Sequence, residues 1–456
     1  MARRKKNTSC KKPNTGYVFR LYPTPDQENF LSKEFGCARL VYNHFLDKTQ
    51  QTYANTKKHT NYQNNAKLLT KLKQTEEFSF LNNVNSQSLQ ASIENLDKGY
   101  QAFFNYIKNP KGKRKVGLPQ FKKKHKSEDK VKIPSGFYLE GIKSNYFLDK
   151  EVFDYPTKLY IPKLKTGIPI NIHREIKGDI VALNISRNKA GQYHASFQVM
   201  ETFAKLPVVN KAIGIDLGIK SFVYDSNGND IQNPRHLKTS RKALRKAQKK
   251  LSRRLEAKKQ RDCCGKGKEC TEHKNTNINK ARENFAKKHL KVTNQRKDFQ
   301  HKLSKQIIDE NQVICLETLM VSGMLKNRKL AKSIQDCGWS QFVRFLVYKA
   351  ERYGRTIVKI DQWFPSSKQC NDCGHTNKQL TLKDREWVCE SCGVSHVRDW
   401  NAAKNILEEG LRLLVEKTGV GYPSVYKEKL VESLVTVLCL EQDKSMAVKQ
   451  EAHRLS

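Results

Sequence analysis

The sequence predicts an α/β domain that is interrupted by a cysteine-rich insertion and preceded by a β-barrel-like domain with a helical insertion. Residues 131–200 contain short runs of alternating apolar and polar residues, which are typical of strands. Residues 30–110 repeat apolar residues every three or four positions, which predicts helices. From residue 208 onward, short apolar runs and amphipathic helices follow one another. The predicted boundaries are 1–29 with 116–207 for the β domain, 30–115 for the helical insertion, 208–364 with 396–415 for the α/β domain, 365–395 for the cysteine-rich insertion, and 416–456 for a tail of unassigned role.

Cap and turn residues delimit the elements of the first half. Thr24, Pro25 and Gln27 have the order of a capping box with proline at the first helical position, so a helix should begin there. A second helix is expected over residues 89–107, and a hairpin over 181–199 around the turn 188–191. Because residues 17–21 also form a strand pattern, the helices are expected to be inserted into the β domain.

The second half begins with the apolar run 212–217, which predicts the opening strand of the α/β domain. Two strongly basic helical runs, 238–260 and 281–307, predict a charged helical hairpin. Further strands are expected at 313–316 and 356–360, with a helix at 342–350 between them.

Composition points to a polyanionic partner. The chain of 456 residues has 86 Lys and Arg against 45 Asp and Glu, a net charge of +41. Basic runs at 3–6, 111–115, 122–126 and 241–254 are broken by aromatics and turns, which favours nucleic acid over an anionic membrane. No apolar run has the length of a membrane span, and none follows the basic start as in a signal peptide. The twelve cysteines favour thiols and metal ligands in a cytoplasmic or nucleoid-associated protein.

Four cysteines have the spacing of a structural zinc site. Cys370 and Cys373 are separated by two residues, as are Cys389 and Cys392, and each pair is followed by glycine. Four thiolates surround Zn²⁺ completely and leave no position for water, so the predicted zinc ribbon is structural rather than catalytic.

Three acidic residues are candidates for a catalytic site. Asp216 lies between Gly214 and Gly218 on one face of the opening strand, a face expected to have room for a phosphate and a cation. Glu317 ends the strand at 313–316, and Asp399 begins a later helix. Each has an ordinary alternative: a solvated strand end for Asp216 and Glu317, and a helix cap for Asp399.

Together, these acids have the layout of a ribonuclease H-like site, with one acid on the opening strand, one on a later strand and one on a following helix. Hydrolysis of phosphodiesters by two Mg²⁺ ions needs several carboxylate ligands that hold the ions about 4 Å apart. Asp216, Glu317 and Asp399 are therefore predicted to be catalytic magnesium ligands. His396 either orients a ligand or leaving group near Asp399 or is a packed imidazole.

Several motifs resemble the TnpB (OrfB) family of insertion-sequence proteins, which is related to the miniature type V CRISPR effectors. The most specific stretch runs from Pro365 to Ala403, and the resemblance covers most of residues 17–412. The remaining matching motifs are residues 19–23, 42–43, 121–126, 214–218 and 294–299, and Glu317. The resemblance implies an RNA-guided DNA endonuclease with a RuvC-type nuclease domain, a bound guide RNA, a double-stranded DNA target, and the acids Asp216, Glu317 and Asp399.

Some features depart from the family or leave alternatives open. Cys263, Cys264, Cys270 and His273 form either a second zinc site or an ordinary loop. Val397 stands where the family often has another acid, and the tail matches no known motif. Three other functions remain open: a CRISPR effector, a DNA transposase that joins strands, and a nucleic-acid-binding regulator without catalytic activity. The intact acids count against the regulator.

Overall fold

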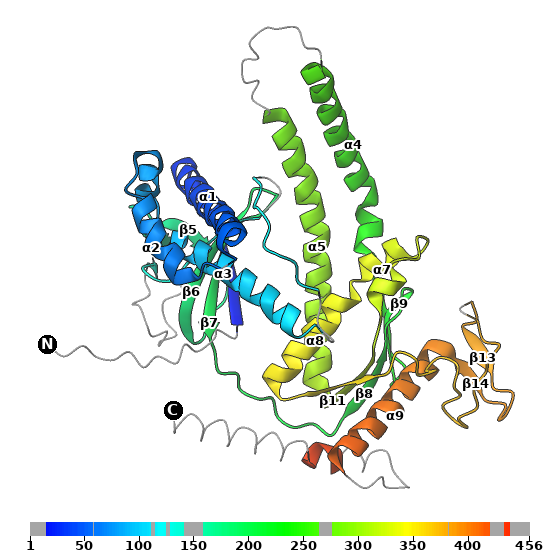
Figure 1. Cartoon of the computed structure of the whole chain (residues 1–456). Helices are drawn as coiled ribbons and strands as arrows, with labels where there is room; N and C mark the ends of the chain where they lie inside the picture. The colour runs from blue at the N-terminus through cyan, green and yellow to red at the C-terminus, as the bar shows by residue number, and fades with distance from the viewer. Residues whose placement is uncertain are drawn as a thin grey trace. The chain divides into compact units, whose positions relative to one another are not determined.

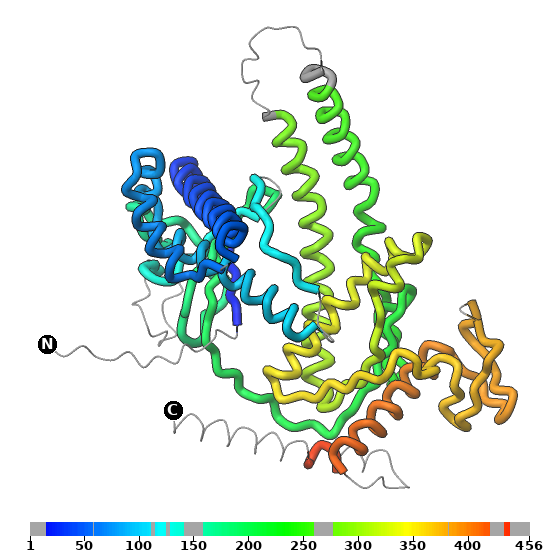
Figure 2. The backbone as a smooth tube through the Cα atoms, in the orientation of Figure 1, coloured from blue at the N-terminus to red at the C-terminus, as the bar shows by residue number. Residues whose placement is uncertain are grey.

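The computed structural model describes residues 15–57, 59–110, 115–124, 128–140, 158–263, 276–381, 383–419 and 433–437 (Figures 1 and 2). The chain divides into two compact units, residues 1–202 with 274–286 and residues 203–273 with 287–456. Among the described residues, no helix has the length and hydrophobicity needed to cross a membrane.

The first unit contains a seven-stranded antiparallel sheet in the order β2-β6-β7-β1-β5-β4-β3. Alternating side chains of β6 and β7 fill its core together with Phe19 and Leu21 of β1. The predicted barrel-like domain is thus an antiparallel sheet with β2 and β3 at its ends. Its strands are β1 (Thr15–Leu21), β2 (Asp129–Ile133), β3 (Tyr138–Leu139), β4 (Lys158–Tyr160), β5 (Ile168–Asn171), β6 (Asp179–Arg187) and β7 (Tyr193–Met200).

Helices lie between β1 and β2 in chain order, in the region where the sequence predicts a helical insertion. They are α1 (Pro25–Thr56), α2 (Tyr62–Leu72), the 3-10 helix η1 (Glu76–Asn83) and α3 (Ser86–Lys108). The capping box at Thr24 is confirmed, since Thr24 and Gln27 exchange hydrogen bonds between side chain and backbone at the start of α1. Leu31 and Phe35 of α1 pack on the sheet, and Phe45 and Leu46 pack on α2 and α3. The prediction missed α2 and η1, which are short and polar.

The second unit contains a five-stranded sheet in the order β10-β9-β8-β11-β12. The three strands β8, β11 and β12 are parallel, and β9 and β10 run antiparallel to their neighbours. The strands are β8 (Ala212–Asp216), β9 (Ser221–Asp225), β10 (Asp230–Gln232), β11 (Val313–Glu317) and β12 (Thr356–Ile360), with a separate hairpin of β13 (Glu386–Val388) and β14 (Ser395–Val397).

Helices cover both faces of this sheet. One core joins Ile213, Ile215 and Leu316 to Trp339 and Phe342 of α8. The other core joins Val313 and Cys315 to Ile406 and Leu411 of α9, which leads away from the β13–β14 hairpin in Figure 1. The helices are α4 (His236–Cys263), α5 (Thr276–Glu310), α6 (Val321–Met324), α7 (Ala331–Cys337), α8 (Trp339–Tyr353) and α9 (Arg398–Thr418).

Candidate nuclease and metal site

The fold brings the three candidate acids to one end of the parallel strands. Asp216 is the last residue of β8, and Glu317 is the last residue of β11. β8 and β11 are neighbouring parallel strands in which Ile215 lies opposite Leu316. Asp216 and Glu317, the next residues of the two strands, therefore lie side by side. Asp399 lies in the first turn of α9, the helix that packs across β8 and β11. Both strand-end acids are half-buried.

The charges of Asp399 and Glu317 both act on Asp216. Burial, followed by the negative charges of Asp399 and Glu317, raises the pKa of Asp216 to about 7. Burial also raises the pKa of Glu317 above its ordinary value. A proton or a cation would relieve the repulsion that Asp399 and Glu317 exert on Asp216.

Two arginines contact the third acid. Arg385, which precedes β13, donates to both carboxylate oxygens of Asp399 at 2.8 and 3.2 Å. Arg398 donates to Oδ1 through Nε at 3.1 Å and through Nη2 at 2.9 Å. Arg398 also lowers the pKa of Asp216, although burial and the other acids outweigh its effect. The sequence prediction missed Arg385, which only the hairpin brings to Asp399.

Close backbone packing fixes α9 on the sheet. A Cβ atom added to Gly214 of β8 would lie 2.2 Å from the Ala403 carbonyl oxygen, and one on Gly410 would lie 2.3 Å from Cys315 Sγ. The expectation of free room beside Gly214 was therefore wrong, because α9 occupies that space. The glycines let helix and strands approach closely, and this contact brings Asp399 toward Asp216.

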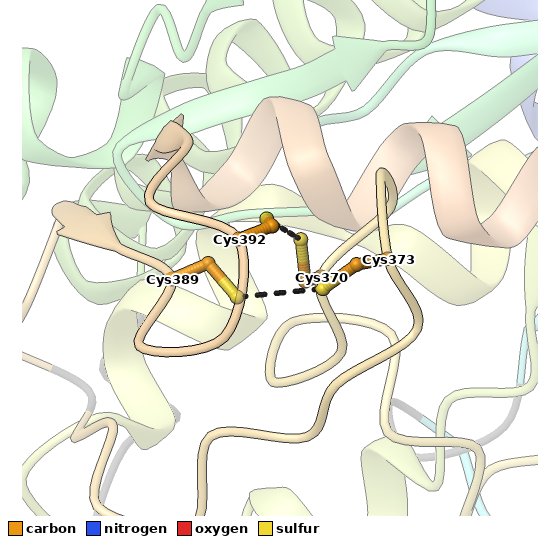
Figure 3. A group of neighbouring side chains, drawn as sticks. All are labelled: Cys370, Cys373, Cys389 and Cys392. Carbon is orange, nitrogen blue, oxygen red and sulfur yellow. Dashed lines mark hydrogen bonds between the residues drawn. The ribbon is translucent and has the colours of Figure 1, made fainter.

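The four predicted zinc ligands converge from two loops (Figure 3). The Sγ atoms of Cys370 and Cys392 are 3.7 Å apart, those of Cys373 and Cys389 are 3.5 Å apart, and all four lie within 4.8 Å of one another. Four sulfurs at about 2.3 Å from one zinc ion would stand roughly 3.8 Å apart in a tetrahedron, so this donor set fits the ion. Gly374 and Gly393, at φ 77° and 73°, allow the chain to turn back after each pair.

His396 belongs to the cysteine cluster rather than to the acids. Its Nε2 atom lies 3.0 Å from Cys370 Sγ, and its ring packs on Trp387 with ring centroids 4.8 Å apart. Asp372 lies 3.7 Å from the same nitrogen. The packed imidazole is thus the alternative that agrees with the structure.

Two buried asparagines connect the cysteine cluster to α9. Asn405 donates to the carbonyl oxygens of Ser366 at 2.7 Å and Gln369 at 2.6 Å, and accepts from Asn371 Nδ2 at 3.1 Å. Asn401 also donates to Gln369 O, at 2.6 Å, and accepts from the Asn371 backbone N–H at 3.0 Å. Both asparagines are 2% exposed. The sequence prediction missed this role, although two asparagines four residues apart inside a helix are a signal for it.

Some predicted nucleic-acid contacts are exposed, and one has a structural role. Arg241, Lys242, Arg245 and Lys246 of α4 are exposed. In contrast, the Lys122 ammonium lies 3.8 Å from the Tyr42 ring centroid, and its backbone exchanges hydrogen bonds with the Asn43 side chain at 2.8 and 2.9 Å. The motif at residues 42–43 and the motif at residues 121–126 therefore contact each other. Residues 3–6, 111–114 and 125–126 lie outside the described residues.

The possible second metal site also lies outside the described part of the chain. Cys264, Cys270 and His273 are not described, nor is the side chain of Cys263.

Three protein-family models match the chain. They are described as "Cas12f1-like, TNB domain" over residues 339–406, "Probable transposase" over 196–328 and "Helix-turn-helix domain" over 14–58. The last of these covers β1 and the single long helix α1 rather than two helices.

Curated relatives match nearly the whole chain. A protein of Streptomyces pristinaespiralis named "Putative RNA-guided DNA endonuclease" is 34% identical over 398 residues, covering 87% of this chain and 89% of the relative. A protein of Escherichia coli K12 named "Putative RNA-guided DNA endonuclease InsQ" is 26% identical over 415 residues, covering 87% and 92%.

Solved structures give weaker matches. A Cas12f1–sgRNA–target DNA complex has a TM-score of 0.42 at 16% identity, covering 83% of this chain and 82% of that one. The endonuclease Cas_phi3 has a TM-score of 0.46 at 12% identity, covering 88% and 93%. Family membership rests instead on the sequence relatives. With the motifs around Asp216 and Cys370, and a relative that is 34% identical over 87% of this chain and 89% of its own length, this chain belongs to the TnpB (OrfB) family of insertion-sequence proteins.

Proposed function

We propose that this chain is an RNA-guided DNA endonuclease of the TnpB type, which hydrolyses DNA phosphodiesters with magnesium held by Asp216, Glu317 and Asp399. The observation that carries the proposal is the position of the three acids: Asp216 and Glu317 end neighbouring parallel strands, and Asp399 begins the helix that packs across both strands. The names of the two full-length relatives support the same activity.

The arrangement of the second unit supports a ribonuclease H-like, RuvC-type domain. One acid ends the opening strand β8, one ends the parallel strand β11, and one begins α9 on the face of the sheet. We also propose that the β13–β14 hairpin and its cysteine loops form a zinc ribbon inserted into this domain, and that residues 1–29 with 116–207 and residues 30–115 are separate β and helical domains.

The carboxylates fit a hard divalent cation, because their oxygens are its preferred ligands and its charge offsets their mutual repulsion. When bound, two such ions would activate water and stabilise the charge that develops on the phosphate. The chain's own contribution is positional. Strand register holds Asp216 beside Glu317, and α9 holds Asp399 near both. Arg385 and Arg398 neutralise part of the charge of Asp399.

A bound guide RNA would supply the sequence specificity of cleavage. The net charge of +41 gives affinity for any nucleic acid but does not select a sequence. Pairing of a bound RNA with the target strand would supply that selection, as the names of the relatives indicate.

The proposal is tested by replacing each acid separately with alanine. Asp216→Ala, Glu317→Ala and Asp399→Ala should retain RNA and bind target DNA, yet leave it uncut in magnesium. Cleavage should fall by at least about a hundredfold in each case, and the double variants should be no worse, because the acids act as one unit. The matched control is Glu310→Ala, at an exposed acid that ends α5, before the end of β11 opposite to Glu317. Near wild-type cutting by any of the three variants would exclude that residue as a metal ligand.

A further inference from the structure

The turn between β12 and the cysteine cluster presents a tryptophan to solvent. Trp363 is 82% exposed, whereas Trp339 and Trp387 are 2% and 7% exposed. The fourth tryptophan, Trp400, donates its indole N–H to the Ser226 carbonyl at 3.0 Å. Leaving an indole in water forgoes a large gain from burial, which a flat partner that covers the ring would recover.

The turn is anchored on both sides of the indole. The Trp363 backbone N–H donates to Asp361 Oδ1 at 2.8 Å. Phe364 packs against the core under α9, and the carbonyl of buried Ser366 accepts from Asn405 at 2.7 Å. Ile360, before the turn, is fully buried. The fold therefore holds the indole outward.

Trp363 also lies at the catalytic end of the sheet. Ile360 pairs with Glu317 in the parallel ladder, and Thr318 Oγ1 donates to the Ile360 carbonyl at 2.7 Å. Three residues of extended chain span at most about 11 Å, and paired strands lie about 4.8 Å apart. The Cα atom of Trp363 is thus within roughly 16 Å of that of Glu317, a span of a few nucleotides.

We propose that Trp363 is a stacking platform for an unpaired base of the DNA strand that enters the carboxylate site. The inference rests on the proposed function and adds a subsite to it. An indole stacks on any base, and such contacts are tolerant of sequence, as an enzyme guided by RNA requires. The basic chain supplies attraction to phosphates, and Trp363 supplies a fixed position for one base near the scissile bond.

Binding can be tested without cleavage in the full-length Asp216→Ala protein with its copurified RNA. A single-stranded oligonucleotide with the sequence of the cut strand should quench the solvent-exposed tryptophan emission. Adding Trp363→Phe should remove the quenching and preserve affinity, because phenylalanine still stacks. Adding Trp363→Ala should weaken binding about tenfold. The matched control, Val208→Ala, changes another exposed apolar side chain and should have no effect.

Quenching that survives Trp363→Phe would overturn the proposal. So would a Trp363→Ala protein that binds the oligonucleotide as tightly as the Val208→Ala protein does.

Cleavage of substrates that lack one base locates the contact. In the wild type, removing the stacked base should raise KM about tenfold with little change in kcat. In Trp363→Ala the same abasic substrate should be cut like the intact one. A penalty that persists at every position in Trp363→Ala would contradict stacking. If the wild type cuts no DNA, the proposed function fails, and the fluorescence experiment still decides the stacking.

Discussion

At the scale of single residues, Asp216 links protonation to metal binding. Its pKa of about 7 arises from burial and from the charges of Asp399 and Glu317, so a large fraction of it is protonated at pH 6. A protonated carboxyl is a poor magnesium ligand. At low magnesium concentration, the cleavage rate should therefore fall about tenfold per pH unit below pH 7. A higher magnesium concentration should shift this decrease to lower pH. Rates measured against pH at two magnesium concentrations check this, and a decrease that stays at the same pH would contradict it.

Glu34 makes the first unit sensitive to pH. The side chain is 2% exposed, accepts from the Asn85 backbone N–H at 2.6 Å, and has a pKa raised by burial from 4.5 to about 7. Because the pKa is raised in the folded protein, the stability that protonated Glu34 contributes is fully present below pH 4.5. It decreases as the pH rises above 4.5 and is lost once the pH has passed through 7. The loss should be on the order of 3 kcal/mol.

Glu34→Gln keeps the acceptor for Asn85 and cannot ionise. Its free energy of unfolding should lose this pH dependence and exceed that of the wild type at pH 8. Urea denaturation of the full chain between pH 4 and 8 measures this. Glu28→Gln, at an exposed acid on the same helix, is the control and should retain the wild-type profile. Parallel profiles for wild type and Glu34→Gln would show that Glu34 ionises freely in the folded protein.

At the scale of elements, α9 connects the cysteine cluster to the acids. Asn405→Ala removes two donors and one acceptor from buried partners and should cost about 2–3 kcal/mol. Because the helix then holds Asp399 less firmly, cleavage should fall while one zinc per chain remains. Cys389→Ser should instead lose the zinc as well as activity.

Metal analysis and thermal unfolding of these variants separate the two effects. Arg412→Ala breaks ion pairs with Glu409 and Glu416 on the same helix without touching the cysteine loops' asparagine contacts, and it serves as the control. Full activity of Asn405→Ala would show that the asparagines are merely packed. Wild-type protein without zinc after purification under reducing conditions would exclude the zinc site itself.

At the scale of the whole molecule, the positive charge provides affinity for nucleic acid, and a bound RNA should select the DNA target. With a net charge of +41, the protein should bind any DNA at low salt and lose this binding steeply as salt rises. Ribonuclease treatment before DNA is added should abolish the site-specific products and leave nonspecific binding. Gel analysis of cleavage with and without this treatment measures the difference. Unchanged products at the same site would indicate a protein that reads DNA by itself.

The candidate ligands could be predicted from the sequence, because ligand types and short spacings are local properties. The cysteine pairs 370–373 and 389–392 predict a zinc site, and the four Sγ atoms do converge. Likewise, the capping box at Thr24 and the alternating strand β7 follow from local pattern alone.

Which of these residues come together depends on the fold, since strand register and helix packing join residues far apart in the chain. The contact of α9 with Gly214 and Gly410 explains why glycine stands there and how Asp399 approaches Asp216. The arginine on Asp399 and the asparagines behind the cysteine loops belong to the same assembly. The exposure of Trp363 also depends on the fold. The sequence shows only an apolar residue that follows a strand, whereas the anchored turn holds its side chain in solvent.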